Sequence, residues 1–378
     1  MAKIRLAIVR QKYRPDGGAE RFIARTLEAL EGEVLDLSII TRRWQGMAKT
    51  GWHVYICNPV KWGRISRERG FAKAARACWQ KENFDLVQSH ERIAGCDIFR
   101  AGDGVHKVWL HQRARLLSPL QRLLSKFSRY HRYVMSAETA LFHSPELKKI
   151  ICNSLMVKND IMTHFQVPED KIVVINNAID TTRFMPADTE KLLRAREAFD
   201  LPPEAKVFIY VGSGFERKGL AASIQAIADS DAHLLVIGQD KRVGDYQKLT
   251  QRLGCAGRVH FMGVQQDVIP FYHAADALML PTLYDPFPNV ILEAMACGLP
   301  VITSTRCGGA EFISQGIDGF VCDALDITAL AIAARNIPRR NSDPRMGNAA
   351  RQRVLPCTPQ RLATQLHQLY AELLQHDK

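Results

Sequence analysis

Apolar residues recur in this chain in two alternating patterns, which are short continuous runs and longer stretches with a helical period. Strand-like runs of the first half lie at 3–9, 35–41, 53–57, 84–89, 148–154 and 172–180. Those of the second half lie at 205–212, 233–238, 258–263, 277–281 and 300–304. Helical segments stand between the runs, for example at 19–30 and 65–79. Strands that alternate with helices predict an α/β protein with parallel sheets covered on both faces.

The alternation stops once and then starts again, which predicts two domains. The polar segment 181–203 contains Pro186, Pro202 and Pro203 and is the expected linker. We therefore expect two Rossmann-like, doubly wound domains, at 1–183 and 184–357. Ligands of such sheets bind at the carboxyl ends of the strands, so a cleft between the domains is the expected site.

Charge distinguishes the two halves. The 378-residue chain has a net charge of +12, with 28 Lys+Arg and 14 Asp+Glu in residues 1–150 but 17 of each in residues 201–378. The halves are therefore expected to meet different partners. Nine cysteines without a C-x-x-C pair favour a reducing compartment. Neither a signal peptide nor an apolar run of about 20 residues is recognisable, which favours the cytoplasm.

The stretch DPFPNVILEAMACGLPVI, residues 285–302, carries the clearest chemistry. A helix is expected to start near Pro288 or Asn289, because proline suits a first helical turn. The amides of Asn289 and Val290 would then hold phosphate oxygens. Asp285 and Glu293 would accept hydrogen bonds from sugar hydroxyls on either side. The alternative is an ordinary buried helix that carries one carboxylate in its first turns.

A second candidate is VGSGFERKGL, which follows the strand at 205–212. Gly212 and Gly214 loosen a turn, and Arg217 and Lys218 are expected at the beginning of the next helix. The dipole of a helix N-terminus disfavours cations, so a bound diphosphate would explain them. The alternative is a solvated pair of surface charges.

Gly17 and Gly18 directly precede the expected helix at 19–30. Residues without Cβ would let an anionic group approach the helix start. A plain tight turn explains the pair equally well. No G-x-G-x-x-G follows any strand, which argues against an NAD enzyme.

Taken together, these motifs resemble the retaining glycosyltransferases of the GT-B fold, family 4. The resemblance rests on Asp285-x7-Glu293 with EAMACGLPV, and on YRPDGGAER, VGSGFERKG, VIGQDK and VHFMGV. It is strongest to enzymes that build the lipopolysaccharide core. The family has Glu where this chain has Asp285, one methylene shorter, so its hydroxyl contact is expected to differ.

The resemblance implies a role for each matching donor-side residue. Arg217 and Lys218 would neutralise the phosphates of a nucleotide-sugar donor as the leaving group gains charge. Phe287, which looks exposed in the sequence, would begin the segment 287–290 that holds the sugar and phosphates. Glu293 would bind the ribose.

Further roles implied by the resemblance lie outside this motif. Gly17 and Gly18 would approach the donor diphosphate, and Gly263 and Val264 would line the nucleobase pocket. The final helix, at 358–376, would return to the N-terminal domain.

Neither a metal nor a resident cofactor is expected if Arg217 and Lys218 stabilise the leaving diphosphate. The chain contains one D-x-D triplet, at 229–231. Such triplets bind metal in the other major glycosyltransferase fold. This one precedes the strand at 233–238, at its amino end, and is interpreted as a polar turn.

On the acceptor side, Asp103 stands between Gly102 and Gly104. The resemblance makes it the candidate that contacts the reacting hydroxyl or the donor sugar, together with Arg217, Lys218 and Asp285 on the catalytic side. An ordinary Asp-Gly turn is the alternative. His90 and His106 are weaker candidates, because a lone histidine is more often structural.

The expected activity is transfer of a hexose, most simply from UDP-glucose or UDP-N-acetylglucosamine, to a lipopolysaccharide core acceptor with retention. Two other functions stay open. A nucleotide-sugar 2-epimerase would share the phosphate site. A basic protein that binds nucleic acid would explain the charge, but the chain has no recognition motif for it.

A basic and apolar segment predicts contact with a membrane surface. Residues 104–137 contain no Asp or Glu, and six cations in 108–135 alternate with leucines and aromatic residues. Pro119 interrupts the segment, so a turn and then a helix from about Leu120 are expected. Such a helix would lie on the anionic inner membrane and make the protein peripheral. The alternative is a core helix with solvated charges.

Overall fold

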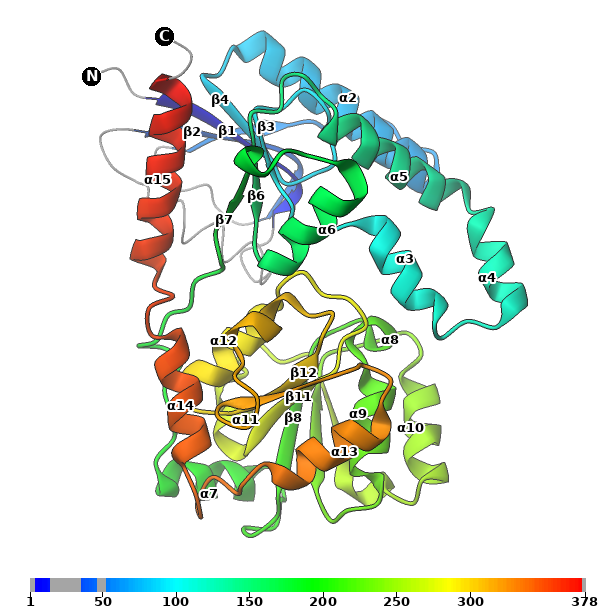
Figure 1. Cartoon of the computed structure of the whole chain (residues 1–378), viewed down its shortest axis with the longest axis vertical. Coiled ribbons are helices and arrows are strands. Elements are labelled where there is room, and N and C mark those ends of the chain that lie inside the picture. Colours follow the sequence, from blue (N-terminus) through cyan, green and yellow to red (C-terminus); the bar gives the residue numbers. More distant parts are fainter. Residues whose placement is uncertain (1–3, 14–34, 46–51, 376–378) are drawn as a thin grey trace. The chain divides into compact units, whose positions relative to one another are not determined.

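The computed structural model describes residues 4–13, 35–45 and 52–375 of the chain (Figure 1). Contacts divide the chain into two units, each with its own core. Unit 1 contains Met1–Asn177 and Pro359–Lys378, and unit 2 contains Ala178–Thr358. The expected boundaries lay after residues 183 and 357, so the chain leaves unit 1 six residues earlier than the linker predicted.

Unit 1 is built on a parallel sheet with the order β3-β2-β1-β4-β5-β6-β7 in the described residues. Its strands are β1 (Ile4–Tyr13), β2 (Leu35–Trp44), β3 (Trp52–Ile56), β4 (Leu86–Ser89), β5 (Ile98–Arg100), β6 (Lys149–Cys152) and β7 (Ile172–Val174). The order reverses between β1 and β4, as in a doubly wound sheet. Leu6, Ala7, Ile8 and Val9 of β1 are buried on both faces, which explains the continuous apolar run.

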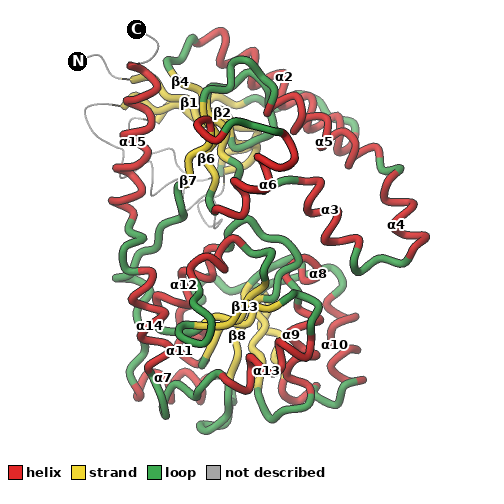
Figure 2. The backbone as a smooth tube through the Cα atoms, in the orientation of Figure 1, coloured by secondary structure: helices red, strands yellow, loops and turns green. Residues whose placement is uncertain are grey.

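Figure 2 shows the described helices of unit 1 around this sheet, with α4 extending away from the strands. They are α2 (Gly63–Glu82), α3 (His106–Ala114), α4 (Pro119–Lys126), α5 (Arg129–Phe142), α6 (Leu155–Phe165) and α15 (Pro359–Gln375). Helix α15 buries its apolar stripe, including Leu366 and Tyr370, and the Tyr370 hydroxyl donates to Gln88 Oε1 at 2.8 Å. The final helix therefore packs at the end of β4 in unit 1, although it follows unit 2 in the chain.

Unit 2 repeats the same plan with the order β10-β9-β8-β11-β12-β13. Its strands are β8 (Val207–Val211), β9 (His233–Ile237), β10 (Val259–Gly263), β11 (Ala277–Leu280), β12 (Val301–Ser304) and β13 (Gly319–Cys322). Its helices are α7 (Thr189–Ala198), α8 (Phe215–Lys218), α9 (Leu220–Ala228), α10 (Val243–Arg252), α11 (Ile269–Ala274), α12 (Asn289–Ala296), α13 (Ile327–Asn336) and α14 (Arg345–Val354). The reversal of strand order lies between β8 and β11.

The predicted α/β architecture is confirmed, and the eleven predicted strands are present. The sequence pattern missed β5 and β13, which have three and four residues. The expected helix at 19–30 lies outside the described residues. No helix in the described part of the chain is long and apolar enough to cross a bilayer.

Candidate active site

The donor-side candidates meet at the reversal of strand order in unit 2. The chain leaves β8 through Gly212 and enters α8, and it leaves β11 at the loop that contains Asp285. The two segments are joined by backbone contacts. The carbonyl of Arg217 accepts from the Leu283 amide and from Thr282 Oγ1, both at 2.9 Å. The carboxyl ends of β8 and β11 therefore form one rigid platform.

A glycine makes this approach possible. Gly219 ends α8 with φ 79°, and a Cβ there would lie 2.0 Å from the carbonyl oxygen of Pro281. Only glycine accepts both the backbone angle and the contact. It holds the end of α8, and thus Lys218, against the end of β11.

Lys218 and Arg217 converge on Asp285. Lys218 Nζ lies 2.6 Å from Asp285 Oδ2, and Arg217 Nη1 lies 3.4 Å from the same oxygen. The Lys218 and Asp285 side chains are only 11% and 7% exposed, whereas Arg217 is 41% exposed. Arg217 can therefore reach a ligand, and Lys218 is fixed in place by its carboxylate partner.

The prediction that Arg217 and Lys218 lie at the beginning of a helix is wrong. Arg217 and Lys218 are not at a helix start, because α8 is a separate four-residue helix and they form its last turn. Cations are favoured at that end. Lys218 also has a protein partner, Asp285, so no diphosphate is needed to explain its presence.

Asp285 is held from several directions. Burial acts to raise the pKa of its carboxyl, but Lys218, Arg217 and the Phe287 amide outweigh burial and lower it. Its backbone amide donates to the Arg306 carbonyl at 3.0 Å, and its carbonyl accepts from Gly308 at 2.8 Å. This aspartate is thus an ionised, immobile group at the centre of the platform.

Helix α12 begins at Asn289, with Pro288 as its N-cap, as predicted. Pro288 provides no side-chain cap for the first turn. Glu293 lies one turn further and is 8% exposed, and its Oε2 accepts from the Tyr272 hydroxyl at 3.0 Å. The tyrosine therefore fixes the orientation of this carboxylate.

Phe287 is buried, contrary to its exposed appearance in the sequence. It is 5% exposed and contacts Phe312 edge-on, with ring centroids 5.5 Å apart. Two flanking prolines suggested a surface loop, but the loop folds back onto the core. Any contact of Phe287 with a ligand is left to its backbone, next to Pro288, Asn289 and Val290.

The loop after β12 was not predicted from the sequence as part of the site. Gly308 and Gly309 are buried there, and a Cβ on Gly309 would lie 2.5 Å from Ile291 Cδ1 in the first turn of α12. A glycine pair that directly follows a strand was the available signal. This loop closes the platform on the side of Asp285.

Gly263 and Val264 lie at the end of β10. Gly263 has φ 69°, and its carbonyl accepts from Gly238 at the end of β9. Val264 is 63% exposed. An exposed apolar side chain at the carboxyl edge of the sheet suits contact with a flat ring, but these contacts leave the nucleobase role a prediction.

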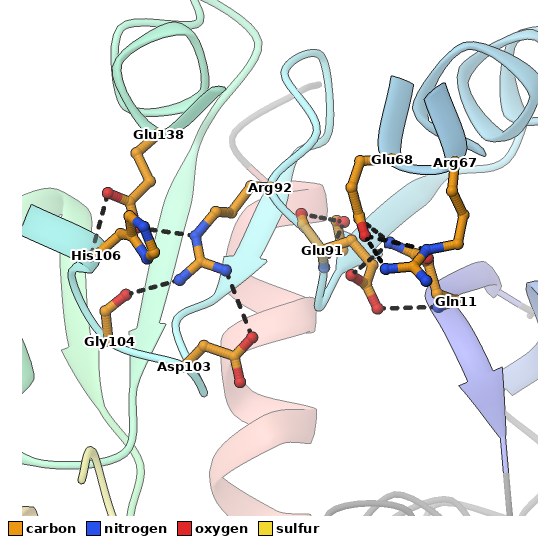
Figure 3. A network of polar contacts seen from close by, with 10 residues as sticks. Gln11, Arg67, Glu68, Glu91, Arg92, Asp103, Gly104, His106 and Glu138 are labelled. Atoms are coloured by element: carbon orange, nitrogen blue, oxygen red, sulfur yellow. Dashed lines mark hydrogen bonds and ion pairs between the residues drawn. The ribbon is translucent and has the colours of Figure 1, made fainter. Parts of the chain in front are cut away.

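In unit 1, Asp103 follows β5 and is 66% exposed. Arg92 supports it, with Nη1 3.4 Å from Asp103 Oδ2 and Nη2 3.2 Å from the Gly104 carbonyl (Figure 3). Arg92 Nε also donates to Glu138 Oε1 at 2.8 Å. An arginine that holds two sides of the turn explains how Asp103 keeps an exposed carboxylate in a fixed place.

Glu138, which was not predicted from the sequence, supports the Asp103 turn through Arg92. It is 1% exposed on α5 and accepts from the His106 amide at 2.9 Å as well as from Arg92. Burial raises its pKa, and Arg92 and the His106 amide act against that rise. An isolated acid after the acid-free segment 104–137 was the signal. It anchors the start of α3 to α5.

The two histidine candidates are both turned inward. His106 Nε2 lies 3.0 Å from His131 Nδ1, and burial, Arg92 and His131 lower the pKa of His106 to about 4. His90 Nε2 lies 3.0 Å from Gln88 Nε2, and burial lowers its pKa well below the usual value. Both histidines are therefore neutral near pH 7.

A second polar group lies at the end of β1 (Figure 3). The Gln11 amide donates to Glu91 Oε1 at 2.9 Å, and its side chain donates to Glu68. Glu68 also accepts from Arg67 at 2.8 Å. These contacts join the ends of β1 and β4 to the first turns of α2.

Two further sequence features remain, the Gly17-Gly18 pair and the D-x-D triplet. Gly17 and Gly18 lie outside the described residues. The D-x-D triplet lies between α9 and β9, at the amino end of that strand. Among the described residues no group of three or more His, Cys, Asp or Glu is placed to hold a metal. Independence from metal stays a prediction.

Two family descriptions match the chain in sequence. Residues 16–183 match Glycosyltransferase Family 4, and residues 193–353 match Glycosyl transferases group 1. These two matches correspond closely to unit 1 and unit 2.

Individual proteins agree with this result. The chain is 27% identical to the lipopolysaccharide glucosyltransferase WaaG of Escherichia coli K12, over 82% of this chain and 83% of that protein. It is 29% identical to the lipopolysaccharide core biosynthesis glycosyltransferase LpsE of Rhizobium meliloti, over 86% and 87%.

Solved structures show the same fold. A crystal structure of WaaG superimposes with a TM-score of 0.80 at 24% identity, covering 95% of this chain and 98% of that one. Anabaena HepE in complex with UDP-glucose gives 0.73 at 17% identity, covering 98% and 100%. The two matched families, the relatives and the paired parallel sheets lead to one conclusion: the chain belongs to the GT-B glycosyltransferases, with a family 4 domain followed by a group 1 domain.

Proposed function

We propose that this glycosyltransferase moves a hexose from a nucleotide-diphosphate sugar, UDP-glucose or UDP-N-acetylglucosamine, to a lipopolysaccharide core acceptor. The observation that carries the donor class is the group Arg217, Lys218 and Asp285 beside the start of α12. Two cations and a helix N-terminus favour a leaving diphosphate. WaaG and LpsE, by their names, act on lipopolysaccharide.

We also propose that the transfer proceeds with retention. Asp285 is ion-paired with Lys218 at 2.6 Å, which makes its carboxylate a weak nucleophile and a weak base. In a same-face reaction, the departing phosphate receives the proton of the acceptor hydroxyl. Such a reaction needs Asp285 neither as a nucleophile nor as a base. Lys218 and Arg217 would stabilise the leaving charge without a metal ion.

The test is transfer from radiolabelled UDP-glucose, UDP-N-acetylglucosamine and a GDP-sugar, with and without extracted core lipopolysaccharide. Label should enter the lipid only with acceptor present, and EDTA should not reduce the rate. Proton NMR of fresh product should show the anomeric configuration of the donor. Turnover of UDP-N-acetylglucosamine without acceptor would instead identify a 2-epimerase.

Asp103 is the proposed contact to the reacting hydroxyl or to the donor sugar. Arg92 holds the turn, and the Asp103 carboxylate is exposed. Asp103→Asn should lower turnover while the affinity for UDP stays unchanged. Asp170→Asn, an exposed acid in the same unit, is the matched control. Equal activity of the two variants would leave Asp103 as an ordinary Asp-Gly turn.

We further propose that α4 binds the anionic surface of the inner membrane from the cytoplasmic side. The predicted helix from about Leu120 is two helices, α4 and α5, and a further helix, α3, precedes them. Helix α4 starts at Pro119 with Ser118 as its cap. None of its residues is buried. Its large apolar side chains are strongly exposed, at Leu120 66%, Leu123 51%, Leu124 61% and, just beyond it, Phe127 67%.

That exposure argues against the alternative of a core helix. Apolar side chains beside Arg122, Lys126 and Arg129 suit an interfacial helix. Each basic group near an anionic surface contributes on the order of 1 kcal/mol. None of the nine cysteines forms a disulfide, which agrees with a cytoplasmic location.

Co-sedimentation with vesicles tests this surface. Binding should rise with the anionic lipid fraction and fall with salt. It should drop in Leu120→Ser/Leu124→Ser/Phe127→Ser, whose exposed positions leave folding intact. The charge-matched control for Arg122→Glu/Lys126→Glu/Arg129→Glu is Lys241→Glu/Lys248→Glu/Arg252→Glu on unit 2. Equal binding to neutral vesicles, or no binding to either kind, contradicts the proposal.

A further inference from the structure

A buried arginine in unit 1 is not explained by the donor site or by the Asp103 turn. Arg42 lies near the carboxyl end of β2 and is only 3% exposed. No residue in the described part of the chain accepts a hydrogen bond from its Nε or Nη1. A buried charge without hydrogen-bond partners is strongly unfavourable. Such a group in a native protein calls for a ligand or a catalytic role.

The charges around Arg42 increase this cost. Its pKa is lowered by burial and then by Arg43 and Arg67, and Arg42 is the main cause of a lowered pKa at Lys61. Five cations therefore interact in this corner of unit 1, which are Arg42, Arg43, Lys61, Arg67 and Lys12. They are close enough to favour a common counterion.

The nearby acids do not provide that counterion. Glu68 and Glu91 act on Arg42 in the opposite direction, but both are already used. Glu68 accepts from Arg67 at 2.8 Å and from Gln11. Glu91 accepts from the Gln11 amide at 2.9 Å, and burial raises its pKa (Figure 3). Arg42, Arg43 and Lys61 are left as a positive excess.

The place in the fold favours a ligand. Strand β2 pairs with β1, with Thr41 opposite Arg10 and Arg43 opposite Lys12, so Arg42 lies at the carboxyl edge. The reversal of strand order between β1 and β4 is one strand away. Ligands of doubly wound sheets bind at this edge, near the reversal.

We propose that Arg42 anchors an anion-binding subsite that holds a phosphate group of the acceptor saccharide. A phosphate monoester carries a charge of about −1.5 to −2 near neutral pH, which matches several unneutralised cations. The N–H groups of a guanidinium donate charge-assisted hydrogen bonds to phosphate oxygens. The acceptor is named because the donor phosphates have their own cations, Arg217 and Lys218, in unit 2. The ligand's identity rests on the proposed function, but its charge does not.

The first test is stability, and a pair of buried arginines provides a matched control. Arg196 in unit 2 is also buried, but its Nη2 lies 2.8 Å from Asp276. In phosphate-free buffer, Arg42→Met should raise the Tm by a few degrees, because it removes a buried charge whose Nε and Nη1 have no hydrogen-bond partner. Arg196→Met should lower the Tm. A loss of stability in Arg42→Met like that in Arg196→Met would show a structural role and overturn the proposal.

The second test uses inorganic phosphate as the probe, with chloride at equal ionic strength as the reference. All five tryptophans lie in unit 1, at Trp44, Trp52, Trp62, Trp79 and Trp109. Tryptophan fluorescence therefore follows the unfolding of this unit. Phosphate should raise the unfolding temperature of unit 1 in the wild type and not in Arg42→Met. An equal rise in both proteins would overturn the proposal.

The third test separates acceptor from donor. Arg42→Met should raise KM for the intact core acceptor about 10- to 100-fold and leave the Kd for UDP unchanged. Phosphatase-treated acceptor should show a similarly raised KM with the wild type and no further rise with the variant. A parallel loss of UDP affinity would assign the anion to the donor and overturn the proposal. If no acceptor is used at all, the proposed function fails, and the phosphate-dependent Tm still reports on the subsite.

Discussion

At the scale of single residues, the donor platform depends on the pair formed by Lys218 and Asp285. The ion pair keeps the ammonium at the end of α8, where Gly219 allows close packing against Pro281. The family's glutamate would extend further into the site. The shorter Asp285 instead lies 2.6 Å from Lys218 Nζ, so we expect it to position this cation.

Lys218→Ala should therefore reduce turnover more than donor affinity. Charge on the leaving phosphate grows in the transition state, so a fixed cation contributes most there. Loss of one such preorganised group lowers kcat by roughly 10²- to 10³-fold. Steady-state kinetics with UDP binding measured separately gives both values. Arg242→Ala, which removes an exposed cation paired with Glu216 at 2.7 Å, should change neither. Equal losses in affinity and turnover for Lys218→Ala would remove it from the chemical step.

Glu293 gives a second prediction at this scale. If its carboxylate binds the ribose hydroxyls, Glu293→Ala should weaken donor binding roughly 10- to 100-fold, since hydrogen bonds to charged groups contribute about 1.5–3 kcal/mol. Tyr272→Phe removes the 3.0 Å bond that orients the carboxylate and should cause a smaller loss. Calorimetric titration of UDP measures both. Donor affinity that is unchanged in Glu293→Ala would contradict the ribose assignment.

At the scale of elements, the sequence predicted long apolar strands better than short ones. Strands such as β8 are buried along their length, and a continuous apolar run identifies them. Strand β5 has only three residues, and it ends in Arg100, buried and bonded to Asn177 at 2.8 Å. Its pairing depends on β4 and β6, which are distant in sequence, so no local pattern could predict it.

Helix boundaries limited the site prediction in the same way. The sequence FERKGL was treated as the start of one helix, but Gly219 divides it into α8 and α9. This changes the electrostatic interpretation. Arg217 and Lys218 were expected at a helix N-terminus, which disfavours cations, but they lie at a helix C-terminus, which favours them. The backbone angle of Gly219 follows from its contact with Pro281, which is a tertiary contact.

The helices α3 and α5 contain a pH-sensitive contact. Burial, Arg92 and His131 lower the pKa of His106 to about 4. Between pH 6.5 and 4 the unfolded chain binds a proton that the folded chain does not. The contribution of His106 to stability is therefore fully present above pH 6.5 and is lost as the pH falls toward 4.

His106→Gln should make unit 1 less sensitive to acid. The difference in unfolding free energy between pH 7 and pH 5 should shrink by about 1 kcal/mol, since His106 is partly exposed and solvent reduces the effect. Urea unfolding followed by tryptophan fluorescence measures it. His164→Gln, at an exposed position on α6, should leave the difference as in the wild type. If the unfolding free energy of His106→Gln changes with pH as much as that of the wild type, other groups control the pH dependence.

At the scale of the whole molecule, the proposed roles are divided between the two units. Unit 2 contains the platform proposed to bind the donor, and unit 1 contains Asp103, Arg42 and α4. Each unit has its own sheet and core, but the chain passes between them after Asn177 and again after Thr358. Helix α15 then completes unit 1 through Tyr370 and Gln88. Neither unit is therefore a simple half of the sequence.

This division makes donor binding visible as an unequal change in stability. Unit 2 contains no tryptophan, so calorimetry follows both units and tryptophan fluorescence follows unit 1 alone. UDP at 100 times its Kd should stabilise the unit that binds it by about 2.7 kcal/mol. That corresponds to an increase of several degrees in the Tm of a domain of this size.

The transition temperature of unit 2, measured by calorimetry, should rise more than that of unit 1, measured by fluorescence. Lys218→Ala should reduce the first shift, and Arg42→Met should not. Identical shifts by both methods would mean that the units unfold together, and a rise in fluorescence alone would place UDP on unit 1.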